Sequence, residues 1–341
     1  MKKYFLFVFA IPLLFISSCK EGGAGIQLST GATCEVMVVT DGPDSWKGQL
    51  GDTIRQLFGQ PIAGLPMPEA LMDPMHAPYK VFNDNDMFRR HHNILIVQID
   101  PKQEKPYIDS KKDQWASPQQ VFRFIASSDT AMFRLLSTYF KSIYTLFRET
   151  EIKRTQNTFK RSTDQEAIDA LRSEFGIEMT IPGGFIIAKK AHNFLWLRQS
   201  IHRSKQDTEL GFVFYSVPYT DTANFSPSAM ILRRDTIVGR FIPGPTDGSY
   251  MTTSKEYEPP IFTRSDKFMT GFVVETKGLW KVVNDFMGGP FVSYSYVDPK
   301  NNRLVTAEGY LYGPGTEQRK FMIQLESLLK TIQFYTPENK E

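Results

Sequence analysis

Cysteine is scarce in this chain of 341 residues, which contains only Cys19 and Cys34. So small a number excludes a disulfide framework and a C-x-x-C redox motif. Cys34 falls in the strand-like run from Thr33 to Val39, where a free thiol could be reactive or could pack as a small apolar group. We expect Cys34 to be buried and to pack as an apolar group.

Motifs of known catalytic chemistry are absent from the sequence. There is no G-x-S-x-G elbow, no H-E-x-x-H, no Walker phosphate loop and no G-x-G-x-x-G after a predicted strand. A zinc site needs three or four convergent ligands, and the adjacent His91 and His92 would point to opposite faces of a strand. We therefore predict no metal or other cofactor and assign no catalytic residue. We expect the histidines to lie at the surface or in loops.

The chain also lacks an excess of charge of one sign. Its formal net charge is +3, which becomes +1 when Lys2 and Lys3 are removed with the first 18 residues. Domains that bind nucleic acid are usually strongly basic, because phosphate neutralisation needs a concentrated cationic face. Nucleic acid is therefore not an expected partner.

Only one long apolar run is present, at the start of the chain. Two lysines precede the apolar stretch from Tyr4 to Phe15, and Ile16 to Cys19 fits the lipobox of bacterial lipoproteins. The run is shorter than the roughly 20 residues that a transmembrane helix needs. A transmembrane anchor and an ordinary cleaved signal are the alternatives, but neither accounts for the cysteine. We predict a signal peptide at residues 1–18 and lipidation at Cys19, which would anchor the protein to a membrane of the cell envelope.

The composition of the remaining chain indicates how it is divided. Residues 19–33 are rich in glycine and are predicted to form a flexible tether. With 41% hydrophobic residues, the chain can bury a large core. We predict an N-terminal half at residues 34–160 and a C-terminal half at residues 161–336, either as separate domains or as one continuous domain.

Hydrophobic periodicity predicts the main elements of both halves. Helical spacing of apolar residues occurs in residues 46–57, 133–147, 162–175, 279–286 and 322–332. Strand-like runs occupy residues 35–40, 93–99, 120–126, 185–189, 194–199, 211–218, 271–276, 291–297 and 303–312. The run at 93–99 is apolar without interruption, which indicates a central strand buried on both faces. Because strands and helices come in mixed order with hairpins, we predict an α+β fold with mixed or mainly antiparallel sheets and helices packed on them.

A faint internal similarity links the two halves. Residues 38–42 followed by Trp46 resemble residues 273–278 followed by Trp280, and each predicts a strand, a turn, a tryptophan and a helix. The halves could therefore be two related strand-turn-helix units. Packing of one tryptophan behind each strand would give the same pattern without duplication.

Several short motifs, together with the lipobox, resemble a known family. They are Trp115-Ala116-Ser117-Pro118-Gln119, Gly278-Leu279-Trp280, Met287-Gly288-Gly289-Pro290-Phe291, Gly309 with Pro314-Gly315, and Gln324-Leu325-Glu326. This set is similar to the Bacteroidetes lipoproteins grouped as DUF4837, over most of the mature chain. The resemblance implies an envelope lipoprotein in the outer membrane, facing either the periplasm or the cell surface. It brings no activity that can be assigned to a residue.

Three residues are candidates for ligand binding. Arg89 and His92 lie in a basic run that could bind a phosphate or a carboxylate, although a charged approach to the strand at Ile94 explains the run as well. Trp280 could stack on a sugar ring, and core packing is its alternative. Acid pairs such as Asp298 with Glu308 could serve a glycosidase, or they could form turns and solvated surfaces.

These observations predict a noncatalytic envelope lipoprotein that binds a protein or glycan partner. The alternative is an unrecognised hydrolase that acts on a cell-wall or carbohydrate substrate. A structure distinguishes them, because a deep polar cleft that holds two acids or a His–acid pair would favour the enzyme, whereas a shallow apolar patch would favour the binder.

Overall fold

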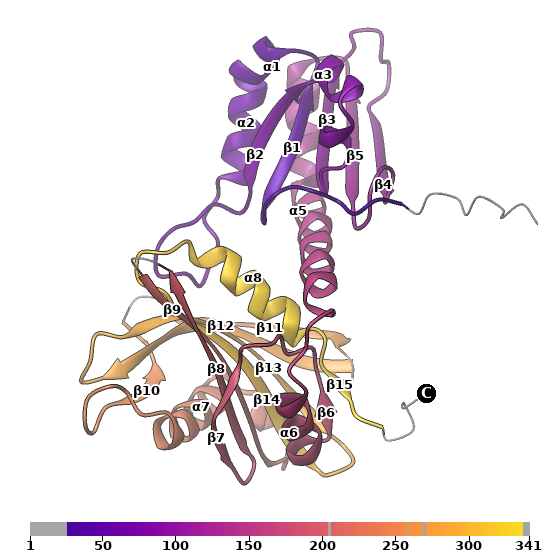
Figure 1. Ribbon diagram of the computed structural model, residues 1–341. Coiled ribbons are helices and arrows are strands. Elements are labelled where there is room, and N and C mark those ends of the chain that lie inside the picture. Colours follow the sequence, from indigo (N-terminus) through magenta and orange to yellow (C-terminus); the bar gives the residue numbers. More distant parts are fainter. Residues whose placement is uncertain (1–25, 204–205, 257, 269–270, 337–341) are drawn as a thin grey trace, which may run out of the picture.

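The computed structural model describes residues 26–203, 206–256, 258–268 and 271–336. Two β-sheets, each with its own helices, lie one above the other in the view of Figure 1. The expected boundary after residue 160 falls between them, and we call the two parts the first half and the second half. The predicted signal peptide and Cys19 lie outside the described residues.

The first half contains a mixed sheet. Its elements are β1 (Glu35–Thr40), α1 (Pro43–Lys47), α2 (Gln49–Phe58), β2 (Asp73–Pro78), α3 (Tyr79–Asp84), α4 (Asp86–Arg89), β3 (Asn93–Ile99), β4 (Tyr107–Lys112), β5 (Gln120–Ala126) and α5 (Asp129–Phe159). The five strands are ordered β2-β1-β3-β5-β4. Only the pairing of β4 with β5 is antiparallel.

Both faces of this sheet are covered. Helices α2 and α5 pack on one face, where Phe58, Phe122 and Phe147 meet. Phe82 of α3 packs on the other face. The central strand β3 is accordingly buried on both sides along its first five residues, which confirms the interpretation of its apolar sequence.

The second half contains an antiparallel sheet. Its elements are α6 (Gln165–Phe175), β6 (Ile177–Glu178), β7 (Ile186–Ala191), β8 (Phe194–Arg203), β9 (Gln206–Pro218), the 3-10 helix η1 (Thr222–Phe225), α7 (Pro227–Phe241), β10 (Tyr250–Thr253), β11 (Ile261–Phe268), β12 (Gly271–Val283), β13 (Gly288–Asp298), β14 (Arg303–Tyr312), α8 (Gln318–Leu329) and β15 (Gln333–Phe334). The strand order is β10-β12-β13-β14-β9-β8-β7, with β11 also paired to β12. Strands β6 and β15 form a separate pair.

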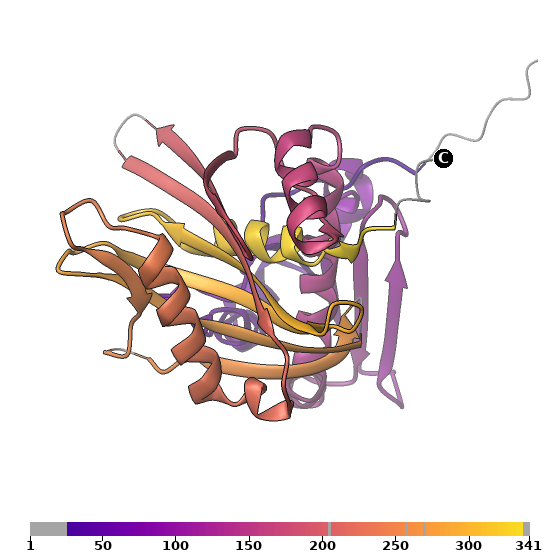
Figure 2. The same cartoon turned by 90° about the horizontal axis from the view of Figure 1, so that it is seen from below.

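Helices cover both faces of this curved sheet (Figure 2). On one face, Leu325 and Leu329 of α8 enter a core that also holds residues of α6. A Cβ atom on Gly309 would lie 3.0 Å from the Leu325 side chain, so the glycine lets α8 approach the sheet closely. Val238 of α7 packs on the opposite face. The α+β class with mixed and antiparallel sheets is therefore confirmed.

Helix α5 joins the two halves (Figure 1). Ser128 caps its N-terminus, and its first turns pack on the first sheet. Its last turns contact α8 of the second half, where the Gln156 side chain donates a hydrogen bond of 3.0 Å to the carbonyl of Ser327. None of the helices in the described part of the chain combines the length and apolar composition needed to cross a lipid bilayer.

Residues 26–33, assigned above to the flexible tether, are attached to the first half. The Ser29 N–H donates to the carbonyl of Ser117, and the Thr30 N–H donates to the carbonyl of Arg90. Thr30 in turn accepts a hydrogen bond from the backbone N–H of His92. This part of the expected tether is therefore an ordered segment, held by backbone hydrogen bonds and by contacts from the side chains of His92 and Arg154.

The helix predicted at residues 279–286 is wrong. Strand β12 continues through Leu279 and Trp280 to Val283, and it pairs with β13 as far as Gly288. Trp280 and Val282 enter the core under α7. Because both faces of the sheet are covered, apolar residues stand next to one another in this strand and imitate helical spacing.

The proposal that the two halves are related strand-turn-helix units is also wrong, because different elements follow β1 and β12. In the first half, β1 is followed by helices α1 and α2 and then by parallel pairing with β2 and β3. In the second half, the corresponding strand β12 turns at Asn284 into the antiparallel strand β13. The two halves are therefore not copies of one strand-turn-helix unit.

Candidate functional site

A large hollow lies where α5 meets the second half. We call it the polar groove, and its volume is about 950 Å³. Glu149, Gln156 and Lys160 line it from α5, and Lys330 lines it from the segment after α8. Most of its remaining lining comes from β11, β12 and the approach to β15. The groove is therefore shared between the two halves and carries many hydrogen-bonding groups.

A smaller hollow adjoins the polar groove, because Glu275 and Thr263 line both. We call it the charged pocket, and its volume is about 270 Å³. Its walls come from the loop that contains residues 62–65 and from α5, β11, β12, β13 and α8. The loop belongs to the first half and reaches across to β12, where Gly64 lies beside Lys277.

Glu326 on α8 is the centre of the ion pairs at the charged pocket. Its side chain is 5% exposed and lies 2.6 Å from Arg148, 2.8 Å from Lys330 and 3.5 Å from Lys277. Burial alone would raise the pKa of Glu326, but the three cations hold that pKa well below its usual value. Glu326 is therefore ionised and is not suited to donate a proton.

A second carboxylate, Glu275 on β12, extends the network. It lies 3.2 Å from Lys277 and accepts a hydrogen bond of 2.7 Å from the hydroxyl of Tyr294. Burial opposes the charge on Lys277, but Glu326 and Glu275 raise its pKa overall. Lys277 therefore remains a cation between two carboxylates.

A contact between the halves closes the far side of the pocket. Arg319 of α8 donates hydrogen bonds to the carbonyl of Ala70 and to the Asp73 carboxylate, both at 2.5 Å. Glu69 accepts hydrogen bonds from the backbone N–H groups at the start of α8. The loop between α2 and β2 is thus fixed to the second half by side-chain and backbone contacts.

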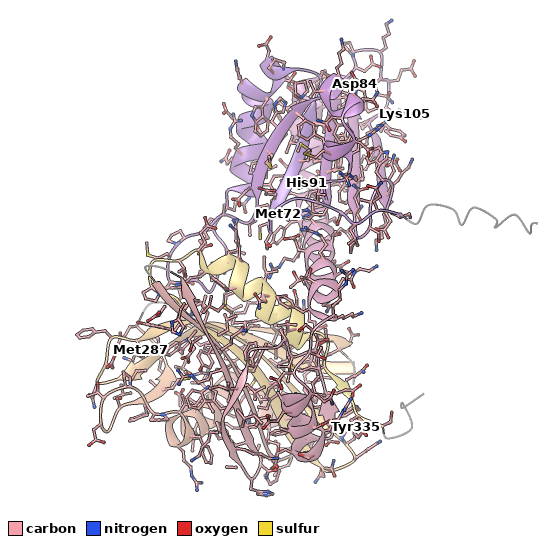
Figure 3. The ribbon with its side chains drawn as sticks, viewed as in Figure 1. Met72, Asp84, His91, Lys105, Met287 and Tyr335 are labelled. Atoms are coloured by element: carbon pink, nitrogen blue, oxygen red, sulfur yellow. The ribbon has the colours of Figure 1, made fainter. Side chains whose placement is uncertain are left out.

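A second cluster of titratable groups surrounds His91 and His92 in the first half. The two imidazole rings are stacked, with centroids 4.6 Å apart. His92 lies 2.7 Å from Glu151 and 2.8 Å from the carbonyl of Thr30, and Arg154 lies 2.8 Å from the same carboxylate. Figure 3 places His91 at the end of the first half that is nearest the second half.

Burial and neighbouring groups shift the pKa values of two members of this cluster. Burial would raise the pKa of Glu151, but contacts to His92, the Cys34 backbone N–H and Arg154 lower it to about 2. Burial and the neighbouring His92 lower the pKa of His91 to about 4. The cluster therefore brings together the neutral ring of His91, the ring of His92 and the ionised carboxylate of Glu151.

The expectation that the histidines lie at the surface or in loops is met by this pair only through the loop alternative, because His91 and His92 lie in the segment before β3 but are not at the surface. His92 is fully buried, and His91 is 4% exposed. The adjacent rings do not point to opposite faces, because His91 and His92 precede β3 rather than lie within it. Exposed side chains at His192 and His202 fit the expectation. Within the described ranges, no group of three His, Cys, Asp or Glu side chains could hold a metal ion.

The candidates Arg89, His92 and Trp280 do not form one site. Arg89 pairs with Asp86 at 3.1 Å at the surface of α4. His92 is enclosed by Thr30 and Glu151. Trp280 is 2% exposed and donates to the carbonyl of Leu311, so its packing alternative holds.

The acid pair Asp298 and Glu308 is also divided between two structural roles. Arg303 and Asn301 hold Asp298 in the hairpin loop. Glu308 makes a two-point contact with Arg234 of α7, at 2.7 and 2.8 Å.

Cys34 is buried as expected, and burial raises the pKa of its thiol to about 12.

Comparison with known families separates the same two halves. Residues 164–331 match the family described as Domain of unknown function (DUF4837). The resemblance drawn from the sequence motifs is confirmed over these residues. Residues 29–160 match a second family, described as Domain of unknown function (DUF8532), and the Trp115–Gln119 motif falls within that match. The boundary between the matches lies between α5 and α6.

Other comparisons add little. No curated protein shows a significant match to the chain. Among solved structures, a mutant of protein Mog1 aligns with 48% of this chain and 93% of its own chain, at 11% identity and a TM-score of 0.32. Similarity at this level carries no argument about fold or function.

The residues of the polar groove and the charged pocket were not identified as a site from the sequence. One signal was present, since Glu326 lies in the Gln324-Leu325-Glu326 motif and Lys277 precedes the Gly278-Leu279-Trp280 motif. Their partner Arg148 comes from the other half of the chain. Only the packing of α5 on α8 brings these charges together.

Proposed function

We propose that this protein is an envelope lipoprotein, anchored through Cys19, that binds a glycan in the polar groove without transforming it. The anchoring rests on the lipobox in the sequence. The binding rests on one structural observation: a hollow of about 950 Å³ lies between the halves and is rich in hydrogen-bonding side chains.

The lining of the groove suits a hydroxyl-rich ligand. Amide, hydroxyl and charged groups of Gln156, Lys160 and Thr180 line it, and the partly buried Phe268 adds an aromatic ring. Phe268 is stacked on Tyr294 with centroids 5.3 Å apart. Sugar rings combine hydroxyl groups with apolar faces, and a site of this kind can bind both.

One observation favours the hydrolase alternative, because Glu149 and Glu275 both line the polar groove. Two other observations oppose it. Its His–acid pair, His92 with Glu151, is sealed from solvent. At the charged pocket, three cations keep Glu326 ionised, whereas a general acid must hold a proton. Release of a shortened product from an oligosaccharide by the purified protein would support the alternative.

The anchoring is tested by labelling cells with an alkyne-bearing fatty acid. We expect the wild-type protein and the Cys34→Ala variant to be labelled and to fractionate with membranes. The Cys19→Ala variant should lose the label. Equal labelling of Cys19→Ala and wild type would contradict anchoring at this residue.

Glycan binding is tested with chitotetraose and maltotetraose as probes, by calorimetry on the mature chain. We expect Lys160→Ala, which removes a groove side chain at the end of α5, to weaken binding of at least one probe about tenfold. Lys153→Ala removes an exposed lysine of the same helix that does not line the groove, and it should bind like wild type. Absence of binding to both probes, or equal loss in both variants, would contradict the proposed site.

A further inference from the structure

The charged pocket is a site distinct from the polar groove, although the two are neighbours. One part of its wall is apolar and comes from Leu71, Tyr144, Met322 and Ile323. The other part carries charged groups of α5, β12 and α8. A ligand that fits both parts must itself have an apolar end and a charged end.

The charges at the pocket do not balance. Arg148 and Lys277 face two carboxylates, Glu275 and Glu326, whereas Arg319 is paired with Asp73 at 2.5 Å. Lys330 contacts Glu326 from the neighbouring groove and is the third cation of this network. The network therefore has an excess of one positive charge. Since Glu326 is held as an anion and Lys277 as a cation, this excess is present at neutral pH.

Two of the cations also have unused donors. Arg148 bonds Glu326 through one terminal nitrogen, while its other terminal nitrogen is buried and has no partner among the described residues. The Nε atom of Arg319 is likewise buried without a partner among the described residues, although the terminal nitrogens of Arg319 bond Ala70 and Asp73. Buried donors without partners are rare in proteins, because each one costs desolvation energy. An oxyanion would supply the missing acceptor and neutralise the excess charge.

We propose that the charged pocket binds a small amphiphile with one carboxylate and a short apolar body, whose carboxylate lies at Arg148 and Lys277. The volume of about 270 Å³ corresponds to about nine groups the size of a water molecule, which suits a chain of medium length. Among the lining residues, Ile261 is 41% exposed, and residues 62–65 form part of the wall.

The test uses octanoate as the probe and octanamide, which has the same length and no charge, as the control ligand. Calorimetry on the mature chain with Cys19→Ala should show octanoate binding at least tenfold more tightly than octanamide. Equal affinity for the two ligands, or no binding of octanoate, would overturn the proposal. Loss of glycan binding would not affect this result, because the two sites are measured with different probes.

Variants locate the site. Arg148→Met should weaken octanoate about tenfold and leave octanamide unchanged, whereas Arg240→Met, at an exposed arginine of α7, should change neither. Since Arg148→Met also removes a partner of Glu326 and could reduce folding, Glu275→Gln provides a second measurement. Removing this negative charge should tighten octanoate several-fold. Unchanged octanoate affinity in folded Arg148→Met, or in Glu275→Gln, would contradict the assignment.

Discussion

The carboxylate of Glu69 accepts a hydrogen bond of 2.6 Å from the backbone N–H of Gln318, which is 249 residues further along the chain. A second bond, of 3.1 Å, comes from the N–H of Arg319. The residue at the N-cap position of α8, Glu317, makes no capping bond with its own side chain. A helix of the second half is thus capped by a residue of the first, where the negative charge also favours the helix dipole.

Removing this cap should destabilise the protein. We expect Glu69→Ala to lower the free energy of unfolding by about 1–2 kcal/mol, because two N–H groups of α8 lose their acceptor. Urea denaturation measures the effect. Glu317→Ala is the matched control, since Glu317 is mainly exposed and makes no cap, and it should cost no more than about 0.5 kcal/mol. Equal losses in both variants would argue against capping by Glu69.

The packing of α8 on the second sheet gives a further prediction. Leu325 is fully buried, so Leu325→Ala should lower the free energy of unfolding by about 2–5 kcal/mol. Leu232 on α7 is 70% exposed, and Leu232→Ala should have little effect in the same urea melts. A small loss at Leu325 would mean that α8 does not dock where the structure places it.

The buried pair of Arg234 and Glu308 should stabilise the protein only as a pair. Their side chains are 3% and 0% exposed. Glu308→Leu should cost about 3–5 kcal/mol, because Arg234 stays buried without its carboxylate. The double variant Arg234→Met/Glu308→Leu should recover most of this loss, as measured by a double-mutant cycle in urea. Additive losses would show that the two residues act independently.

The lowered pKa of His91 predicts a loss of stability in weak acid. The pKa is about 4 in the folded protein against 6.5 for a free side chain, so below pH 6.5 the unfolded chain binds a proton that the folded chain does not. This difference should remove about 2 kcal/mol between pH 7 and pH 5. Glu151 contributes little in that window, because its stabilising charge is lost only between pH 4.5 and 2.

His91→Gln should therefore lose about 2 kcal/mol less than wild type when urea melts at pH 7 and pH 5 are compared. His192→Gln, at a side chain that is 91% exposed, should keep the wild-type dependence. If both variants behave alike, another group causes the acid sensitivity.

Much of the fold could be predicted because its patterns are local. The run at residues 93–99 and the stripe of apolar residues at 133–147 correspond to β3 and α5. The loop Asp298–Asn302 forms the turn between β13 and β14, as its turn-forming residues predicted. Helix spacing and strand runs are properties of neighbouring residues, so a single sequence contains them.

The helix prediction at residues 279–286 failed because a strand that is buried on both faces has apolar residues at adjacent positions, which removes the two-residue alternation expected of a strand. Leu279 and Trp280 are adjacent apolar residues of β12, and both are buried although neighbouring side chains of a strand point to opposite faces. The interior histidines were missed for a related reason. His92 is enclosed by Thr30 and Glu151, which are 62 and 59 residues away, and no local pattern shows such a contact. The charged pocket is assembled in the same way from distant segments.

Helix α8 is the last helix of the described chain, yet it lies between the two halves. Its contacts with Glu69 and Arg148 span 249 and 178 residues. Contacts of such high sequence separation form late, because the long intervening loop must close before they are gained. A chain is made from its N-terminus, so the first half is complete well before α8 exists. The junction of the halves is therefore expected to be the final step of folding, and a chain truncated before residue 318 should leave uncovered the apolar face of the second sheet on which Leu325 and Leu329 pack.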